Sequence, residues 1–162
     1  MSAAEPLNQV YLGLGSNIQP ELNLPRAVAL LAGQVKIDAI SRVWQTPPVG
    51  NSGPCFLNAV ARITTNLNQL ELKVQILRLI ETRLGRVFTE NRNDPRIIDL
   101  DILIFNDKQI DAEIWNFAHL CVPLAELYPD YTNPETGETI RQAAEQFRQA
   151  HYIKLSPLQL EI

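Results

Sequence analysis

The sequence predicts an α+β sandwich whose elements follow the order β-α-β-β-α-β, with extra elements at the C-terminal end. Four apolar runs have the length of strands, and two longer runs space their apolar residues as amphipathic helices do. Turn-forming residues separate these runs. The chain contains no internal repeat, low-complexity segment or linker, so we expect a single domain over residues 1–162.

The first half of the chain supplies three strands and a helix. QVYLGLGSN is the first strand, and PELNLPRAVALLAG is a helix that ends at Gly33. VKIDAISRVWQT is the second strand, closed by PPVGNSGP, where proline and glycine exclude regular structure. CFLNAVARITTN alternates as the third strand. Its two faces carry Phe56, Asn58, Val60 and Arg62, and Leu57, Ala59, Ala61 and Ile63.

A second helix, a fourth strand and several weaker elements follow. Asn68 and Glu71 form a capping-box pattern that opens a helix through about Leu84. Its apolar stripe consists of Leu70, Val74, Leu77, Ile80 and Leu84. After the fourth strand, VPLAELYPD predicts a helical turn, GETIRQAAEQFRQA a terminal helix and YIKLSPLQLEI a closing strand or tail. This order is that of a ferredoxin-like sandwich, a fold that serves many functions.

Composition limits the function classes. The chain is 46% hydrophobic and 20% charged with a formal charge of −4, so no whole-molecule basic field attracts nucleic acid. The polar start MSAAEPLNQ is no signal peptide, and no apolar run approaches the roughly 20 residues that span a bilayer. Cys55 and Cys121 match no metal or redox spacing. We expect a cytoplasmic monomer with unpaired thiols and no membrane partner.

The fourth strand, within NDPRIIDLDILIF, carries two carboxylates in an apolar run. Alternation places Ile98, Leu100, Ile102 and Ile104 on one face and Asp99, Asp101, Leu103 and Phe105 on the other. A buried carboxylate is costly unless it is paired or binds a metal. With Cα atoms about 6.5 Å apart, the two aspartates suit one or two Mg²⁺ ions bound to substrate phosphates. A solvated face with no ligand is the other interpretation.

Five arginines stand within nineteen residues beside this strand: Arg78, Arg83, Arg86, Arg92 and Arg96. Guanidinium groups are fitting partners for phosphate oxygens, so arginines beside a metal-binding pair predict a triphosphate ligand. For Arg78 and Arg83, a solvated helix position is the simpler interpretation. GLGSN lacks the lysine and the glycine spacing of a P-loop.

Several sequence motifs, taken in order, resemble those of one known enzyme family. They are YLGLGSN at 11–17, SRVWQTPPVG at 41–50, FLNAV at 56–60, LGRVFTENRNDPRIIDLDILIF at 84–105 and the shorter VPLAELYPD. The chain resembles the 6-hydroxymethyl-7,8-dihydropterin pyrophosphokinases of folate biosynthesis. The resemblance implies transfer of the β,γ-pyrophosphoryl unit of ATP to the pterin hydroxymethyl oxygen, with release of AMP.

The resemblance also implies roles for individual residues. Asp99 and Asp101 would bind two Mg²⁺ ions that bridge the ATP phosphates. Arg86 and Arg96 would contact phosphates and act in catalysis. The nucleotide site would further include Glu81, Arg92 and Ile102.

At the pterin, Asn58 would hydrogen-bond to the ring and Phe56 would stack on it, while Asp99 would lie near it as well. Main-chain contacts would come from Thr46, Pro47 and Val49. Without the resemblance, Phe56 and Asn58 would be an ordinary strand face with one polar residue.

The segment DAEIWNFAHLCVPL departs from the family pattern. Between Asp101 and Pro123 it is short by roughly eight residues, and no Pro-His pair exists there. Phe117 stands where the resemblance expects an arginine, and His119 where it expects an aromatic residue; an ordinary, partly buried histidine is the other interpretation. In the loop before the fourth strand, Phe88 stands where the family commonly has an arginine, and Asn93 where it commonly has a tryptophan. Arg92 would partly replace the positive charge that is lost.

Three functions are compared. The first is the pyrophosphokinase, which the short segment predicts to be slow. The second is a paralogue that binds a pterin or nucleotide with little or no transfer, which pterin-dependent AMP release would distinguish. The third is an RNA-binding module, which needs clustered strand aromatics and a basic sheet face. Because Asp99 and Asp101 lie beside Phe56 and Phe105, we expect small-molecule substrates and no nucleic acid.

Overall fold

A computed structural model describes residues 6–48, 53–90, 94–150 and 153–162. At its centre is a seven-stranded antiparallel sheet with the order β6-β5-β1-β4-β3-β7, and β2 pairs with β4 off this path. The strands are β1 (Asn8–Ser16), β2 (Lys36–Ile40), β3 (Trp44–Thr46), β4 (Phe56–Thr65), β5 (Asp99–Phe105), β6 (Lys108–Gln109) and β7 (Lys154–Leu155).

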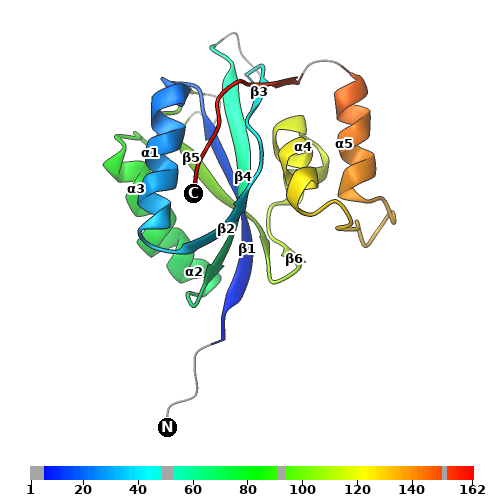
Figure 1. Ribbon diagram of the computed structural model, residues 1–162, viewed down its shortest axis with the longest axis horizontal. Helices are drawn as coiled ribbons and strands as arrows, with labels where there is room; N and C mark the ends of the chain where they lie inside the picture. The colour runs from blue at the N-terminus through cyan, green and yellow to red at the C-terminus, as the bar shows by residue number, and fades with distance from the viewer. Residues whose placement is uncertain (1–5, 49–52, 91–93, 151–152) are drawn as a thin grey trace.

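Helices cover both faces of this sheet. The helices are α1 (Pro20–Ala32), α2 (Gln69–Glu71), α3 (Arg78–Arg83), α4 (Ala118–Leu127) and α5 (Ile140–Gln149). Figure 1 shows α1, α2 and α3 on one side of the sheet and α4 and α5 on the other. The predicted order of strands and helices is confirmed, and so is the terminal helix. The helical turn predicted in VPLAELYPD is the end of α4, which begins earlier, at Ala118.

The predicted second strand divides into β2 and β3. Between them, the main chain of Ser41 donates to the carbonyl of Val60 at 2.8 Å. The Ser41 hydroxyl also accepts a hydrogen bond from the Val60 N–H at 2.8 Å. These bonds hold a bend against β4, so one predicted strand becomes two short ones. The division leaves β3 as a separate three-residue strand.

The second helix starts at the predicted capping box, because Glu71 N–H donates to Asn68 Oδ1 and Asn68 N–H donates to Glu71 Oε1. Its buried face differs from the predicted stripe in the first half. Leu70 and Val74 are 70% and 55% exposed, whereas Leu72 is buried. A π-helical turn over Leu72–Leu77 occupies this half of the helix, and its wider turn departs from the 3.6-residue period on which the predicted stripe depends.

Strand β5 confirms the predicted alternation only as far as a bulge. Its pairing with β1 shifts register there, so Leu103 and Ile104 both pack beneath α4. Phe105 then packs with the cluster on the opposite face. The predicted faces of Ile104 and Phe105 are therefore wrong. Asp99 and Asp101 precede the bulge and keep the positions that alternation gives them.

Two apolar clusters form the core. The cluster on the α1 side includes Val10, Leu12, Leu14, Leu24, Leu31, Leu57, Ala59, Ile63, Leu77, Ile98 and Leu100. The cluster on the α4 side includes Tyr11, Trp44, Val60, Leu103, Ile104, Leu120, Leu124 and Ile140. The alternation predicted for the third strand is confirmed, since Leu57, Ala59 and Ile63 belong to one cluster and Val60 to the other.

The two cysteines are unpaired, as the sequence predicts; Cys55 is exposed and Cys121 is buried. Burial raises the pKa of the Cys121 thiol to about 12, which makes it an inert core residue. Within the described ranges, no helix has the length and apolar character that crossing a bilayer requires.

Candidate active site

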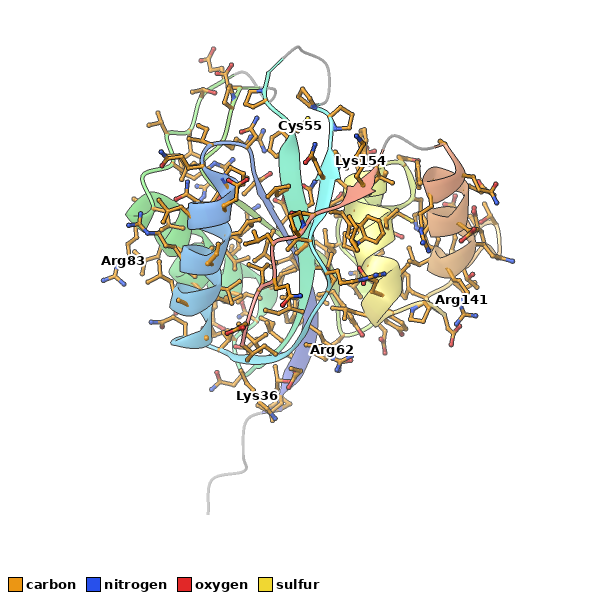
Figure 2. The ribbon with its side chains drawn as sticks, turned by 45° about the horizontal axis from the view of Figure 1, so that its top comes forward. Lys36, Cys55, Arg62, Arg83, Arg141 and Lys154 are labelled. Carbon is orange, nitrogen blue, oxygen red and sulfur yellow. The ribbon has the colours of Figure 1, made fainter. Side chains whose placement is uncertain are left out.

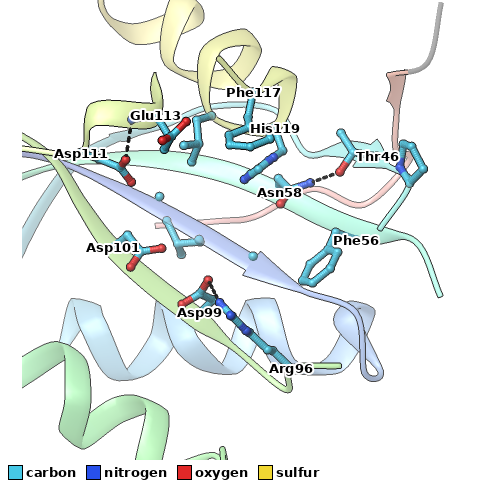
Figure 3. Close-up of a pocket in the computed structure, with 15 residues that line it drawn as sticks. Thr46, Phe56, Asn58, Arg96, Asp99, Asp101, Asp111, Glu113, Phe117 and His119 are labelled. Carbon is cyan, nitrogen blue, oxygen red and sulfur yellow. Dashed lines mark hydrogen bonds and ion pairs between the residues drawn. The ribbon is translucent and has the colours of Figure 1, made fainter. Parts of the chain in front are cut away.

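A pocket of about 310 Å³ lies between the sheet and the start of α4. Strands β1, β3, β4 and β5 form its floor and sides, and residues 111–120 form the opposite wall (Figure 3). Two glycines of β1 keep the floor open. A Cβ at Gly15 would lie 3.1 Å from Asn58 Oδ1, and one at Gly13 would lie 3.4 Å from Leu103 Cδ2. A side chain at Gly15 would therefore crowd Asn58, which lines the pocket, whereas one at Gly13 would meet Leu103 at ordinary contact distance.

At one end of the pocket, the buried amide of Asn58 joins two strands. Its Nδ2 donates to Thr46 Oγ1 at 2.9 Å, across the pairing of β3 with β4. Phe56 lies two residues before Asn58 on the same strand face, and both line the pocket with Thr46 and Pro47. Figure 3 shows the Phe56 ring opposite Phe117 and His119. This end offers fixed hydrogen-bonding groups between ring-bearing walls, which suits a flat polar heterocycle.

At the other end, the two aspartates have different surroundings. Asp99 accepts from Arg86 Nη1 at 2.9 Å through Oδ1 and from Arg96 Nη1 at 2.7 Å through Oδ2. Asp101 is exposed and makes no hydrogen bond or ion pair with another residue in the described part of the chain. Asp99 is therefore neutralised, whereas Asp101 presents an open carboxylate to the pocket.

The surroundings of Asp101 oppose its ionisation. Although part of the side chain reaches solvent, desolvation by the surrounding pocket raises its pKa to about 7, from an ordinary value of 3.8. The carboxylates of Asp99 and Asp111 add smaller upward contributions. The positive charges of Arg86 and Arg96 lower the pKa of Asp101, but by less than desolvation raises it. A carboxyl held in this state gains most from a bound cation, because a cation would compensate the charge that the protein itself leaves uncompensated.

These donors fit Mg²⁺, which takes one or two protein carboxylates and completes its shell with water and phosphate oxygens. Among the described residues, no group of three or more His, Cys, Asp or Glu side chains could hold a metal ion. Two carboxylates leave most of the coordination shell of Mg²⁺ to water and phosphate oxygens.

Arg86 is held in place by the buried carboxylate of Glu81. Glu81, within α3, is 4% exposed and forms an ion pair with Arg86 Nη1. The Arg86 N–H also donates to the Glu81 carbonyl at 3.0 Å. The Arg86 guanidinium lies over the Phe88 ring, 4.5 Å from its centroid. Glu81 therefore positions Arg86 and does not itself line the pocket.

Asn17, the last residue of the GSN motif, holds the segment that carries Arg96. Its Oδ1 accepts from the Arg96 N–H at 2.6 Å, and its own N–H donates to the Arg96 carbonyl at 3.0 Å. Asn17 is 5% exposed, so these bonds are shielded from water. The motif letters signalled this residue, but only the fold shows that its partner is the backbone of Arg96.

Comparison with known proteins decides the family. The family model described as 7,8-dihydro-6-hydroxymethylpterin-pyrophosphokinase (HPPK) matches residues 11–129. The chain belongs to the HPPK family. A Methylorubrum extorquens protein named 2-amino-4-hydroxy-6-hydroxymethyldihydropteridine pyrophosphokinase is 38% identical over 149 residues, which cover 85% of this chain and 92% of the relative. The Bacillus subtilis protein of the same name is 41% identical over 125 residues, which cover 75% and 71%.

Solved structures show the same fold. A Plasmodium falciparum HPPK-DHPS variant matches with a TM-score of 0.74 at 15% identity and covers 90% of this chain. The wild-type HPPK-DHPS with pteroate matches with a TM-score of 0.69 at 15% identity and covers 91%. This chain spans 46% and 43% of those longer chains, respectively. The matches confirm the predicted ferredoxin-like α+β fold.

The short segment of this HPPK-family chain places acidic and aromatic side chains in the pocket. Asp111 caps a 3₁₀ turn by accepting from the Glu113 N–H at 2.8 Å, and both residues line the pocket. Phe117 and His119 line it as well, with ring centroids 5.4 Å apart. Burial lowers the pKa of His119, which favours the neutral imidazole. The sequence prediction omitted Asp111 and Glu113, although their place in the altered segment was a signal.

The remaining predicted HPPK site residues fall in two groups. The side chain of Ile102 is buried in the cluster on the α1 side, so the prediction that it lines a nucleotide site is not supported for its side chain. It packs there because it shares the apolar face of β5. Val49, Arg92 and Asn93 lie outside the described residues.

Proposed function

We propose that this protein transfers the pyrophosphoryl group of ATP to 6-hydroxymethyl-7,8-dihydropterin, giving the pterin diphosphate and AMP. The observation that supports it best is the two-ended pocket. One end presents Asn58, Thr46 and Phe56, and the other presents Asp99, Asp101 and Arg96, with Arg86 paired to Asp99 behind the pocket lining. A molecule spanning both ends would bring a heterocycle and a polyphosphate together in the pocket.

In the proposed reaction, the hydroxymethyl oxygen of the pterin attacks the β-phosphorus of ATP. The bond between that phosphorus and the α,β-bridging oxygen breaks, and AMP leaves with the bridging oxygen. The hydroxyl proton passes to solvent or to a pocket carboxylate. Such transfers ask the protein for positioning and charge rather than covalent chemistry.

Pterin positioning is assigned to side chains that the strands already hold. The Asn58 amide and Thr46 supply hydrogen bonds at the ring edge, supported by their mutual bond of 2.9 Å. Phe56 stacks on one face of the ring, and the ring of His119 faces it across the pocket. Main-chain contacts come from Pro47 and, outside the described residues, from Val49.

Metal binding is assigned to Asp99 and Asp101, with two Mg²⁺ ions as the proposed number. Bound Mg²⁺ would neutralise charge on the reacting phosphates. Arg86 and Arg96 are assigned to phosphate oxygens and would have to leave Asp99 to reach them. The exchange starts from the ion pairs of these guanidinium groups with Asp99, at 2.9 and 2.7 Å. Glu81 limits how far Arg86 moves, and Arg92 completes the proposed nucleotide contacts.

The proposal also covers the whole chain: one domain over residues 1–162, a monomer, in the cytoplasm, with ATP and the pterin as its ligands and no nucleic acid. The relatives are named pyrophosphokinases, and nothing among these names favours the alternative of a binding paralogue without transfer.

The test is AMP release from ATP and Mg²⁺, measured with and without 6-hydroxymethyl-7,8-dihydropterin. The proposal expects AMP only when the pterin is present, in equal amount to pterin diphosphate. Tight pterin and Mg·ATP binding without AMP would support the paralogue instead. Orthophosphate or ADP as the product would contradict the proposed bond cleavage.

A further inference from the structure

Residues 130–162 lie beyond the stretch that matches the family model. They include α5 and β7, and the chain ends in a tail that crosses the edge of the sheet. In Figure 1 this tail passes over β3 and then descends on the side where α1 lies. We call residues 153–160 the C-terminal strap. Its place in the fold raises the question of what it does for the pocket.

The strap touches the pocket-forming strand through main-chain bonds. Strand β7 pairs with β3 in antiparallel register, with Leu155 opposite Trp44 and Lys154 opposite Gln45. Beyond β7, the Ser156 N–H donates to the carbonyl of Val43 at 2.8 Å. Both side chains of β7 are exposed (Lys154 is labelled in Figure 2), so this strand adds little apolar burial. What it supplies is pairing along the outer edge of β3.

The strap also wraps from one core cluster to the other. Ile153 is 7% exposed and packs in the cluster on the α4 side. Leu158 and Leu160 pack against the cluster on the α1 side. The two anchors fix the strap on opposite faces of the sheet, with β3 at the edge between them. A chain anchored at both ends restricts the movement of the strand that it crosses.

The same strand is held from the helical side. Glu126 of α4 accepts from Trp44 Nε1 at 2.7 Å and from Arg42 Nε at 2.6 Å. The Arg148 guanidinium of α5 lies 5.7 Å from the centroid of the Trp44 ring. Contacts from three elements thus converge on residues 42–45, directly before Thr46. A simple cover for a sheet edge would not require this convergence.

We propose that the C-terminal strap positions β3 for substrate binding and thereby determines the affinity for the pterin. Strand β3 has three residues, and it carries Thr46 and Pro47 into the pocket. Thr46 Oγ1 and the Trp44 carbonyl are the acceptors for the Asn58 amide, at 2.9 and 3.4 Å. A displacement of β3 therefore changes both Thr46 and the orientation of Asn58. Asp99, Asp101 and Arg96 belong to the other side of the pocket and are spared.

The inference rests on the proposed function, and its test is the ratio of two affinities. Ser156→Pro removes the N–H that bonds to Val43. We expect the Kd for 6-hydroxymethyl-7,8-dihydropterin to rise about fivefold, the usual effect of one hydrogen bond. The Kd for Mg²⁺ with a non-hydrolysable ATP analogue should stay within about twofold.

Two control variants isolate the strap. Ser156→Ala keeps the N–H and, like Ser156→Pro, loses the hydroxyl that accepts from the Leu158 N–H at 3.2 Å. It should therefore retain the pterin affinity that Ser156→Pro loses. Lys154→Ala shortens an exposed side chain of β7 and keeps the main-chain pairing with β3, and it should also have no effect.

Each contrary outcome has its own meaning. Unchanged pterin affinity in Ser156→Pro overturns the proposal, and so do equal losses for both ligands, which indicate a structural role alone. An unaltered protein that binds no pterin at all contradicts the proposed function instead.

Discussion

The two ends of the pocket are built in different ways. The pterin end is held by neutral groups on paired strands, where Asn58 already donates to Thr46 at 2.9 Å. The phosphate end is held by charges that satisfy one another, with both oxygens of Asp99 bound to arginines. One end can accept its ligand as it stands, whereas the other must exchange partners. Ground-state pterin binding and phosphate transfer should therefore respond differently to mutation.

The largest effect is expected at Asp101. Asp101→Ala removes the open carboxylate, and transfer should fall by at least about 10²–10³, since one lost electrostatic contact to a transition state commonly costs that much. Binding of Mg·ATP should weaken as well, while the fold persists. Titration of Mg·ATP against the variant checks this. Unchanged Mg·ATP affinity would remove Asp101 from the metal site.

A comparison with a relative tests the short segment. We expect turnover on the order of 10² below that of a family member that keeps the Pro-His and Arg positions, since cationic contacts can be worth 10³ or more in phosphoryl transfer. Here Asp111, Glu113 and Phe117 line the pocket in that region. Phe117→Arg should restore part of the rate. Equal turnover in the two proteins would show that the segment is compensated.

Asn58 tests the pterin end alone. Asn58→Ala leaves partners unpaired in a dry pocket, which commonly costs about 1–3 kcal/mol, or roughly five- to hundredfold in affinity. Calorimetry should show this loss for the pterin, with Mg·ATP within a few fold. If both ligands weaken equally, Asn58 supports the fold rather than the pterin.

The proposed exchange of Asp99 for phosphate as the partner of the two arginines predicts a smaller effect, in which a substitution strengthens ATP binding. Asp99→Asn removes the carboxylate that both arginines share, while Arg86 keeps its ion pair with Glu81. ATP in the presence of a chelator should then bind about tenfold tighter, because a charge-assisted bond to phosphate becomes available in place of the bond to Asp99. Asp101→Asn is the matched control, with the same change in charge and no released arginine. It should gain at most about twofold. Equal gains in both variants would contradict the exchange.

The smallest effect concerns stability without ligands. Because the pKa of Asp101 is raised from 3.8 to about 7, its ionised form destabilises the folded state above pH 4, and most fully above pH 7. Asp101→Asn should therefore unfold at higher denaturant concentration at pH 8. The gain is on the order of 1 kcal/mol after allowance for solvent screening of an exposed carboxylate. At pH 4 the two proteins should be alike, and a gain that persists there would have another cause.

Local sequence patterns predict much of the fold and of the site of this protein. The motifs identified the family, the alternation of β4 placed Phe56 and Asn58 on one face, and the capping box placed the start of the second helix. The aspartate pair was found because two carboxylates in an apolar strand violate what a strand prefers. Each of these signals lies within a few residues, where steric and hydrogen-bonding rules act directly.

Other features depended on contacts between distant segments. The bulge in β5, the division of β2 from β3 and the π-helical turn follow from register and packing against neighbouring strands. The pairing of Arg86 with Asp99, the bond of Asn17 to the backbone of Arg96 and the crossing of β3 by the strap join residues that are separated in the chain. Local sequence determined which side chains the site contains. The tertiary structure alone decided which of them are already paired, because a charge or a backbone donor selects its partner only after the chain has brought both together.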